Sequence, residues 1–298
     1  MYNHICESDN HYIELTKLVK KDIPKTVMRA LEEDLGGEIN INNDITVNIL
    51  PKNSKAYAQI ITNEEGIFCG TDWVKEIFKQ LHQSVNLTWH VEERQKIKPK
   101  QLLIEIEGSS RAIITSERTI LNFIQTLSGV ATKVSHYVSL INNTNTKLLD
   151  TRKTLPGLRT ALKHAVICGG GNSHRVGLSD AFLIKENHII AIGSIQKAIE
   201  SARSMLPDNT IEVEVESIAE LIQAINAGAD IIMLDNFDFE KTKQAIKINN
   251  KRVPLELSGN INDCLISKLA QIGIDYISIG DFTKNICSLD MSMRLKIK

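Results

Sequence analysis

The sequence lacks an excess of either charge, and this removes one broad class of partner. Across 298 residues, 35 lysines and arginines face 36 aspartates and glutamates, which leaves a formal net charge of −1. A protein dedicated to nucleic acid or to a charged membrane surface attracts its partner over a distance through an excess of opposite charge. We therefore expect no nucleic-acid partner.

Long apolar segments are also missing. No uncharged apolar run approaches the roughly 18–20 residues that a helix needs to span a bilayer. The first ten residues, MYNHICESDN, contain Glu7 and Asp9 where a secretion signal would have a basic start and an apolar stretch. These absences predict no membrane partner and a cytoplasmic location.

Cysteine is scarce and scattered. A disulfide framework needs paired cysteines in an oxidising compartment, and a zinc site is usually read from ligands at short sequence spacing. No CxxC pair occurs here, so we expect reduced thiols, and only Cys168 lies beside residues of chemical interest. The five cysteines are Cys6, Cys69, Cys168, Cys264 and Cys287.

The first part of the chain predicts helices followed by a mostly antiparallel sheet. Apolar residues from 12 to 35 recur at helical spacing but are interrupted at Pro24, which predicts two short helices. A further helix is predicted at 72–82. Runs of strand character occur at 56–62, 66–70, 87–91 and 102–106.

After Thr115 the pattern changes to alternating helices and buried strands. Apolar residues from 120 to 141 predict a long amphipathic helix capped by Ser116. Continuous apolar runs then alternate with helical segments, which is typical of parallel strands in a barrel or open sheet. The alternating tail at 289–297 predicts a half-buried strand that we place with the first sheet. The six parallel strands are expected at 147–149, 181–184, 211–215, 230–234, 255–257 and 276–279.

Polar clusters follow almost every predicted strand of the second half. The carboxyl ends of parallel strands meet at one edge, so these clusters predict a single site there. They are Asp150-Thr151-Arg152-Lys153, Lys185-Glu186-Asn187-His188, Glu214 to Glu216, Asp235-Asn236, Ser258-Gly259-Asn260 and Gly280-Asp281.

The charges in these clusters predict a polyanionic ligand. Between Arg152 and His188 stand six lysines and arginines and three histidines, against Asp180 and Glu186. This is the wall of a site for carboxylates or phosphates, with surface ion pairs as the alternative. Glu214, Glu216 and Asp235 then need a cation, substrate hydroxyls or the basic wall, unless they form core ion pairs.

The residues therefore predict an enzyme acting on a phosphorylated small molecule. No calcium or zinc spacing is present, so we expect Mg²⁺ to arrive bound to phosphate. The turns around Gly259 and Gly280 are small enough for backbone N–H groups to bind a phosphate. Gly169-Gly170-Gly171 matches no nucleotide fingerprint, and we interpret it as a helix stop that places His174 and Arg175, with direct phosphate contact as the alternative.

Six sequence blocks together resemble the quinolinate phosphoribosyltransferase family, over the chain from about residue 25 to its end. The blocks are ERTILNFIQTLSGVAT (117–132), DTRKTLPGLR (150–159), GGGNSHRVGLSDAFLIKENHI (169–189), IEVEVES (211–217), IIMLDN (231–236) and LELSGNI (255–261).

The resemblance implies an α/β fold in two domains. After an N-terminal helical segment, 1–24, it implies an α/β sandwich at 25–126, joined by 284–298, and an incomplete, TIM-like α/β barrel at 127–283. It also implies that phosphoribosyl pyrophosphate and quinolinate give nicotinate mononucleotide, pyrophosphate and CO₂, in NAD synthesis. A homodimer with a shared active site is implied, and higher oligomers are compatible with it.

The resemblance also implies roles for individual residues. Lys153, Glu214 and Asp235 are the catalytic set, in which Lys153 contacts the phosphoribosyl donor and the two acids lie near the ribose hydroxyls and substrate-bound Mg²⁺. Thr151 is a further substrate-binding candidate. The 5′-phosphate clamp corresponds to Ser258, Gly259, Asn260, Ile279, Gly280 and Asp281. The two quinolinate carboxylates are held by Arg118, Arg152, His174, Arg175 and Lys185, with Arg118 donated across the dimer interface.

One departure and three rival interpretations accompany the resemblance. Ser173 stands where the family has an asparagine before the histidine, which affects a supporting contact. One rival is a barrel aldolase with Lys185 as its Schiff-base lysine. A second is a non-catalytic protein that binds phosphorylated metabolites, which would have no use for the acidic set. A third is a relative of the same fold associated with molybdenum transport.

Overall fold

The computed structural model describes residues 10–259 and 262–297, which form two compact units. The first unit contains the chain up to Ser135, Thr154–Gly170 and the chain from Phe282 onward. The second contains His136–Lys153 and Gly171–Asp281. The domain boundaries predicted at 126/127 and 283/284 stay a prediction, and each unit is described by itself below.

The first unit is built on a four-stranded antiparallel sheet. Its strand order is β12 (Met291–Ile297), β1 (Lys55–Thr62), β5 (Leu102–Ser109) and β3 (Asn86–Trp89). In β1, Ala56, Ala58 and Ile60 are fully buried while the residues between them are partly exposed, which is the period of a half-buried strand. The pairing of β12 with β1 confirms that the tail joins this sheet. A two-stranded ribbon, β2 (Gly66–Ile67) with β4 (Lys96–Ile97), accompanies it.

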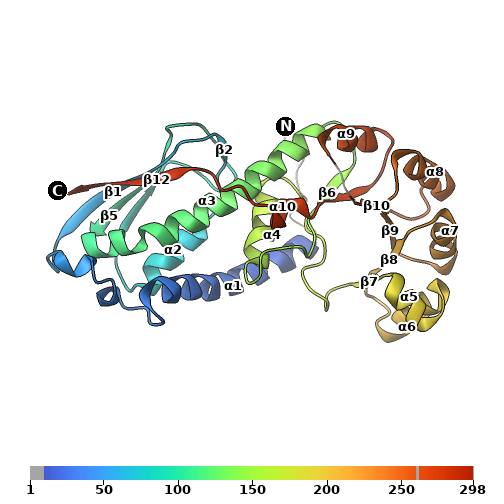
Figure 1. The fold of residues 1–298 in the computed structure, drawn as a ribbon, viewed down its shortest axis with the longest axis horizontal. Helices are drawn as coiled ribbons and strands as arrows, with labels where there is room; N and C mark the ends of the chain where they lie inside the picture. The colour runs from blue at the N-terminus through green and yellow to red at the C-terminus, as the bar shows by residue number, and fades with distance from the viewer. Residues whose placement is uncertain (1–9, 260–261, 298) are drawn as a thin grey trace. The chain divides into compact units, whose positions relative to one another are not determined.

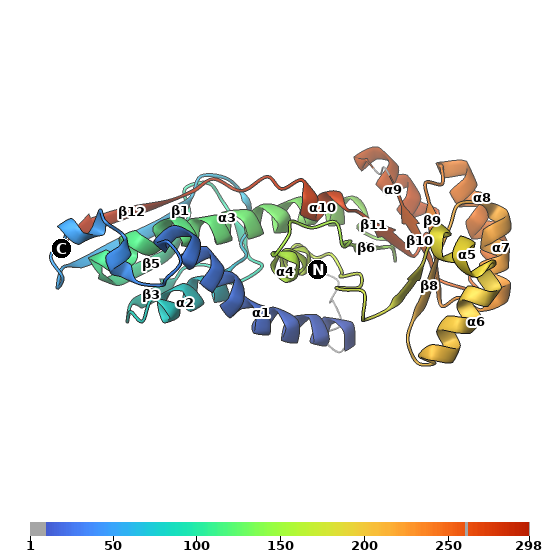
Figure 2. The ribbon, with the colours of Figure 1, turned by 60° about the horizontal axis from the view of Figure 1, so that its bottom comes forward.

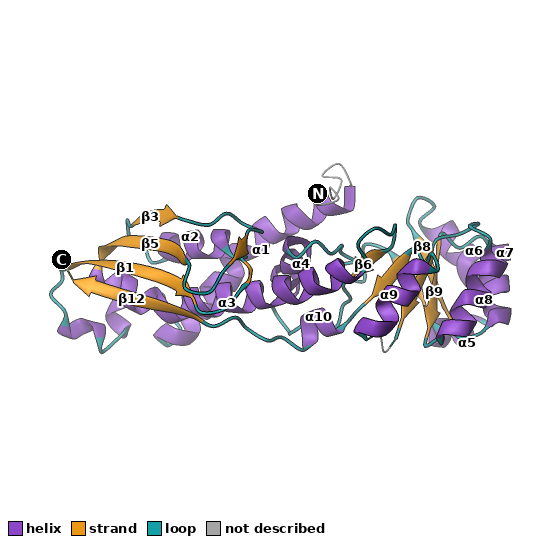
Figure 3. Cartoon of the chain, turned by 90° about the horizontal axis from the view of Figure 1, so that it is seen from above, coloured by secondary structure: helices purple, strands orange, loops and turns teal. Residues whose placement is uncertain are grey.

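Helices α1 (Asn10–Leu35), α2 (Thr71–Gln80) and α3 (Ser110–Leu140) run along one face of this sheet (Figures 1 and 3). Helix α4 (Arg159–Cys168) packs against α1. Two short 3₁₀ turns, η1 (Ile41–Asn43) and η2 (Val47–Ile49), lead from α1 into the sheet. The helices and one face of the sheet together make the predicted α/β sandwich.

The prediction of two short helices around Pro24 was wrong, because α1 is continuous through that residue. Proline removes one backbone hydrogen bond and crowds the preceding turn. Here the lost bond is outweighed by an apolar stripe at every fourth position, which is buried along the whole length of the helix. The stripe consists of Leu15, Val19, Ile23, Val27, Leu31 and Leu35, each at most 6% exposed.

The predicted cap of the long helix was also misplaced. Helix α3 begins at Ser110, directly after β5, and Ser116 lies buried inside it. The Ser116 hydroxyl donates to the carbonyl of Ile113, so it bonds within the helix instead of capping its start. Ala112 and Ile113 are already buried, which shows that the apolar face begins a full turn before Ser116.

The second unit contains a six-stranded parallel sheet with the order β6-β11-β10-β9-β8-β7. This is the cyclic order of a barrel that is open between β6 and β7, as expected for an incomplete α/β barrel. Asn172 forms a parallel bridge with Leu149 at the open edge of β6. The strands are β6 (Lys147–Leu149), β7 (Phe182–Ile184), β8 (Ile211–Val215), β9 (Ile231–Asp235), β10 (Leu255–Ser258) and β11 (Tyr276–Ser278).

Helices cover the outer face of this sheet (Figure 2). They are α5 (Glu186–Ile192), α6 (Ile195–Met205), α7 (Ile218–Ala227), α8 (Phe239–Asn249) and α9 (Asp263–Gln271), and a short α10 (Asp281–Lys284) follows β11. Side chains that accept a backbone N–H fix where four of them begin. These caps are Ser194, Ser217, Asp238 and Asn262. Within the described ranges, no helix combines the length and apolar character needed to cross a membrane.

Candidate active site

All six strands of the second unit run in parallel, so the loops after them lie at one edge of the sheet. Asp150 to Lys153 follow β6, Lys185 follows β7, and Glu214 lies near the end of β8. Asp235 ends β9, Ser258 ends β10, and the sequence Ile279-Gly280-Asp281 follows β11. The predicted strand-end clusters therefore belong to a common edge.

At the open edge of the barrel, the loop after α4 is fastened to β6. The N–H of Asn172 donates to the carbonyl of Leu148 at 2.8 Å, and the N–H of Asp150 donates to the carbonyl of Asn172 at 3.1 Å. The carboxylate of Asp150, which is fully buried, accepts the N–H of His174 at 2.9 Å. These bonds place His174 beside the strands although no strand carries it.

The side chain of His174 enters a buried acidic pair. Its Nε2 lies 2.7 Å from Oε2 of Glu212 on β8 and 3.5 Å from Oε2 of Glu256 on β10. Burial, together with the charge of Glu212, raises the pKa of Glu256 to about 8, although His174 opposes the rise. The Oε1 atoms of Glu212 and Glu256 are buried with no hydrogen-bond partner among the described residues.

Sequence reasoning missed Glu256, and for Glu212, which strand alternation places on the face of Glu214, it left open whether the partner is a cation, substrate hydroxyls or the basic wall. A usable signal was present, because Glu256 stands between Leu255 and Leu257 in a strand that is otherwise apolar. A carboxylate at such a position needs a buried partner or a proton. The histidine that meets it lies far away in the sequence, so the pairing could not be deduced from spacing.

Lys185 and Glu214 form an ion pair at the ends of β7 and β8. Glu214 is 8% exposed, and burial raises its pKa, whereas the contact with Lys185 lowers it. The negative charge of Asp235 also raises the pKa of Glu214, so the two acids of neighbouring strands lie close enough to interact. Asp235 itself accepts the side-chain N–H of Asn236 at 2.8 Å.

Two arginines of the predicted basic wall face the same region. Burial lowers the pKa of Arg175, and so does the positive charge of Arg152, which places the two guanidinium groups within electrostatic reach. Arg175 donates to the carbonyl of Ala181 at 3.2 Å. The Nε of Arg152 is buried with no hydrogen-bond partner in the described part of the chain. Two positive charges close to each other, with a donor that lacks a partner, favour the binding of an anion.

The turn after β11 packs closely on the loop after β6. The N–H of Ile279 donates to the carbonyl of Leu149 at 2.9 Å. A Cβ on Gly280 would lie 2.8 Å from Cδ of Lys153 and 3.2 Å from Oγ1 of Thr151. Gly280 therefore leaves the space in which the Lys153 side chain lies.

The turn after β10 is positioned by β9. The N–H of Asn236 donates to the carbonyl of Ser258 at 3.0 Å, and a Cβ on Gly259 would lie 3.2 Å from Oδ1 of Asn236. Gly259 has a φ of +147°, which favours glycine. Asn260, the third predicted residue of this turn, lies outside the described residues.

Of the remaining predicted residues, one is exposed in the second unit and three belong to the first unit. Glu216 is exposed beyond the end of β8, so it does not share the buried environment of Glu212 and Glu214. Two further basic residues of the predicted wall, Arg159 and Lys163, lie on α4 in the first unit. Arg118 is exposed on α3, also in the first unit, and its place in the site stays a prediction.

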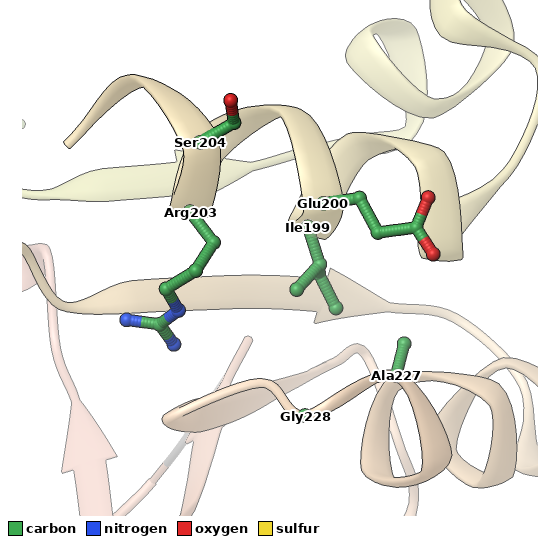
Figure 4. Close-up of a pocket in the computed structure, with 6 residues that line it drawn as sticks. All are labelled: Ile199, Glu200, Arg203, Ser204, Ala227 and Gly228. Atoms are coloured by element: carbon green, nitrogen blue, oxygen red, sulfur yellow. The ribbon is translucent and has the colours of Figure 1, made fainter. Parts of the chain in front are cut away.

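A shallow pocket between α6 and α7 does not compete with this site (Figure 4). It is lined by Ile199, Glu200, Arg203, Ser204, Ala227 and Gly228. Arg203 is bound by Asp230, which directly precedes β9, so the pocket lies at the amino ends of the strands. The predicted chemistry lies at their carboxyl ends.

The fold and the strand-end residues together define an α/β barrel enzyme for an anionic substrate. Comparison with known proteins specifies the family. The profile of the quinolinate phosphoribosyl transferase C-terminal domain matches residues 130–294, and that of the N-terminal domain matches residues 44–128. The chain therefore belongs to the quinolinate phosphoribosyltransferase family, as its sequence blocks predicted.

Individual relatives agree with this assignment over nearly the whole chain. The nicotinate-nucleotide pyrophosphorylase (carboxylating) of Mycobacterium leprae is 34% identical over 275 residues, which cover 91% of this chain and 96% of the relative. The structure of the Francisella tularensis nicotinate-nucleotide pyrophosphorylase has 45% identity and a TM-score of 0.86, and covers 92% of this chain and 97% of the other. The Ehrlichia chaffeensis enzyme gives 34% identity and a TM-score of 0.86, with coverage of 91% and 98%.

Proposed function

We propose that this enzyme transfers the phosphoribosyl group of phosphoribosyl pyrophosphate to quinolinate, with loss of CO₂, and forms nicotinate mononucleotide for NAD synthesis. The observation that carries this proposal is the Nε of Arg152, a buried donor with no partner among the described residues, within electrostatic reach of the cationic Arg175. Quinolinate has two adjacent carboxylates, and two guanidinium groups can bind them bidentately.

The remaining basic residues complete the quinolinate site. His174, held by Glu212, donates toward one carboxylate, and Lys185 at the end of β7 supplies a point charge. Without this positive wall, the two carboxylates would be repelled by the phosphates of the second substrate. The contact of Lys185 with Glu214 is the geometry of an ion pair, which argues against a neutral Schiff-base lysine.

The acidic residues act on the phosphoribosyl group. As the bond from the ribose C1′ to the pyrophosphate oxygen breaks, C1′ becomes cationic, and Glu214 and Asp235 orient the ribose hydroxyls and stabilise that charge. Lys153 stabilises the departing pyrophosphate. The 5′-phosphate is bound by backbone N–H groups of the turns at 258–260 and 279–281. A covalent nucleophile is not required.

The residues fit Mg²⁺ that enters with phosphoribosyl pyrophosphate. Glu214 and Asp235 lie near the carboxyl ends of the paired strands β8 and β9, and carboxylates together with substrate phosphates are usual Mg²⁺ ligands. Bound there, Mg²⁺ would neutralise charge that develops on the leaving pyrophosphate. Glu214 and Asp235 would hold it indirectly, through the substrate.

Decarboxylation follows from the product of transfer. The pyridine nitrogen gives its lone pair to C1′ and becomes positively charged. The bond between C2 and its carboxylate then breaks and CO₂ departs. The electron pair left on C2 is stabilised by the adjacent cationic nitrogen until it binds a proton from solvent. The enzyme supplies position and a favourable electric field for this step.

The assay that tests the proposal combines the protein with quinolinate, phosphoribosyl pyrophosphate and Mg²⁺. We expect nicotinate mononucleotide and CO₂ in equal amounts, and a loss of quinolinate saturation in Arg175→Ala. Arg252→Ala, at an exposed arginine after α8, is the matched control and should behave as the wild type. Formation of no nucleotide by the folded wild-type protein would refute the proposal.

We further propose a homodimer in the cytoplasm, in which each active site receives Arg118 from the partner chain. The exposed position of Arg118 on α3 supports this assignment. Mixing inactive Arg118→Ala chains with inactive Arg175→Ala chains should restore activity, because one of the two sites in a mixed dimer then has both arginines. Verified mixed dimers without activity would contradict a shared site.

A further inference from the structure

Four side chains capable of binding a metal converge in the first unit, apart from the residues assigned to the reaction. Cys69, Glu93, His164 and Cys168 each offer one ligand atom, and all these atoms lie within 4.8 Å of one another. Cys69 is fully buried and Cys168 is 5% exposed. A buried set of two sulfurs, one imidazole and one carboxylate is typical of a site for a borderline-soft cation.

The fold brings these residues together from a ribbon and a helix. Phe68 exchanges backbone hydrogen bonds with Gln95 and Arg94, at 2.9 Å each, which extends the β2–β4 ribbon and places Cys69 beside Glu93. His164 and Cys168 lie four residues apart on α4, and that spacing puts both side chains on one helix face. Each element therefore contributes two ligands.

The separations agree with tetrahedral coordination. Nε2 of His164 lies 3.1 Å from Oε1 of Glu93 and 3.4 Å from Sγ of Cys168, and that sulfur lies 3.8 Å from the same oxygen. With the usual metal–ligand bond lengths of zinc, neighbouring ligand atoms of a tetrahedron are ~3.3–3.8 Å apart. The sulfur of Cys69 lies within 4.8 Å of all three atoms, so the four ligand atoms converge closely enough to bind one ion.

Surrounding contacts hold the ligands in place. The second carboxylate oxygen of Glu93, Oε2, accepts the N–H of Thr71 at 3.0 Å and its hydroxyl at 2.6 Å, while Oε1 accepts the N–H of Gly70 at 3.0 Å and also faces the cluster. The N–H of Cys69 donates to Oγ of Ser128 on α3 at 3.0 Å. The ring of His164 packs against Trp73, with centroids 5.4 Å apart. Such supporting bonds are what a metal site needs to fix ligand direction.

The same geometry argues against a nucleophilic cysteine. In a Cys–His–acid triad, the imidazole binds the thiol through one nitrogen and the acid through the other. Here Nε2 of His164 faces both Cys168 and Glu93. Convergence of both partners on a single nitrogen corresponds to ligands that surround a common point.

We propose that Cys69, Glu93, His164 and Cys168 form a closed, structural site for a zinc-type divalent cation. The bound ion would connect the β2–β4 ribbon and the start of α2 to the end of α4. Two thiolates, a carboxylate and a neutral imidazole complete four-coordination and leave no position for a substrate, so the site stabilises the unit and takes no part in catalysis. The ligands are spread over 100 residues of sequence (69–168), which is why short spacing motifs do not reveal them.

The test uses the full chain and Co²⁺, which reports thiolate coordination by its absorption. After removal of metal with a chelator, Co²⁺ should bind with one ion per chain and give thiolate-to-cobalt charge-transfer absorption and the intense d–d bands of a tetrahedral site. Zn²⁺ should displace it and raise the melting temperature. Cys69→Ser and Cys168→Ser should each lower the charge-transfer absorption by about half, because one of two thiolates is lost.

Cys264→Ser, at an exposed cysteine on α9, is the matched control and should retain the whole spectrum. Circular dichroism verifies that each variant is folded. If a serine variant does not fold, His164→Asn, which keeps both sulfurs, replaces it in the test and should abolish the tetrahedral bands. Absence of charge-transfer absorption in the wild type, or an unchanged spectrum in both serine variants, would overturn the site. So would a Cys69–Cys168 disulfide in the mass spectrum of the freshly purified, unreduced protein. None of these readouts depends on transferase activity.

Discussion

Nε2 of His174 lies 2.7 Å from Oε2 of Glu212, and both side chains are almost completely buried at the carboxyl edge of the barrel strands. A carboxylate at this distance favours a protonated, oriented imidazole. Glu256, at 3.5 Å from the same nitrogen, is kept largely protonated by burial and by Glu212. His174, which we propose contacts the substrate, is thus held beside two acids, of which Glu256 is largely protonated.

Replacement of Glu212 should therefore weaken quinolinate binding. In Glu212→Gln, His174 loses its charged partner, and a hydrogen bond to a charged group contributes about 1.5–3 kcal/mol. We expect the KM for quinolinate to rise ~10–100-fold, with the KM for phosphoribosyl pyrophosphate nearly unchanged. Steady-state kinetics with each substrate varied in turn measures both. Glu216→Gln, at an exposed glutamate of the same segment, should leave both constants unchanged; equal effects of the two variants would contradict the role of Glu212.

The acid pair also predicts a pH dependence of stability. The pKa of Glu256 is raised from its ordinary value of 4.5 to about 8, so the folded state binds a proton that the unfolded state has lost in this range. Its contribution to stability is complete below pH 4.5, decreases as pH rises, and is gone above about pH 8.

Glu256→Gln should remove this dependence. The free energy of unfolding is measured with urea between pH 5 and pH 8.5. Its decrease with rising pH should be less steep in the variant than in the wild type, and the two slopes should differ by up to about 1.4 kcal/mol per pH unit. Glu240→Gln, at an exposed glutamate of α8, should keep the wild-type slope. Parallel curves for wild type and Glu256→Gln would show that Glu256 is ionised throughout.

The strands could be predicted from the sequence because burial leaves a local pattern. The continuous apolar runs of the second half and the alternating tail both correspond to observed strands. The helix boundaries predicted from Pro24 and Ser116 were wrong, because local propensity is weaker than the burial of apolar side chains. In α1, a long buried stripe outweighs the proline. In α3, the buried face begins before the expected cap.

The site was predictable in its residue types and less so in its partners. The residues that follow parallel strands share one edge of the sheet. The positions of Arg152, Lys185 and Glu214 at that edge could therefore be predicted without coordinates. The contact of His174 with Glu212 depends on how the loop after α4 lies on β6, and no sequence period encodes that. Lys163 was predicted to belong to the basic wall from its position among other basic residues; it lies buried on α4, and its place in the wall stays a prediction.

The ion pair of Lys185 and Glu214 predicts non-additive substitutions. Lys185→Ala and Glu214→Gln should each lower kcat/KM by at least ~10-fold, because one removes a charge proposed to bind quinolinate and the other a charge proposed to lie near the ribose. The double variant should be less impaired than the product of the two effects, since each single change leaves the other group without its partner. Lys247→Ala with Glu240→Gln, on α8, provides a control pair. Strict multiplication of the two effects would indicate that the residues act independently.

The close packing of Gly280 on Lys153 yields the last prediction. In Gly280→Ala, the new Cβ would lie 2.8 Å from Cδ of Lys153, so the flexible lysine must move away from its position. Because Lys153 is proposed to contact the departing pyrophosphate, we expect kcat to fall by ~10-fold or more, with a smaller change in the KM for quinolinate. In a Lys153→Ala background the same glycine substitution should cost little more, since the displaced side chain is already absent. If Gly280→Ala is as harmful without Lys153 as with it, the glycine acts through the backbone of the turn and not through the lysine.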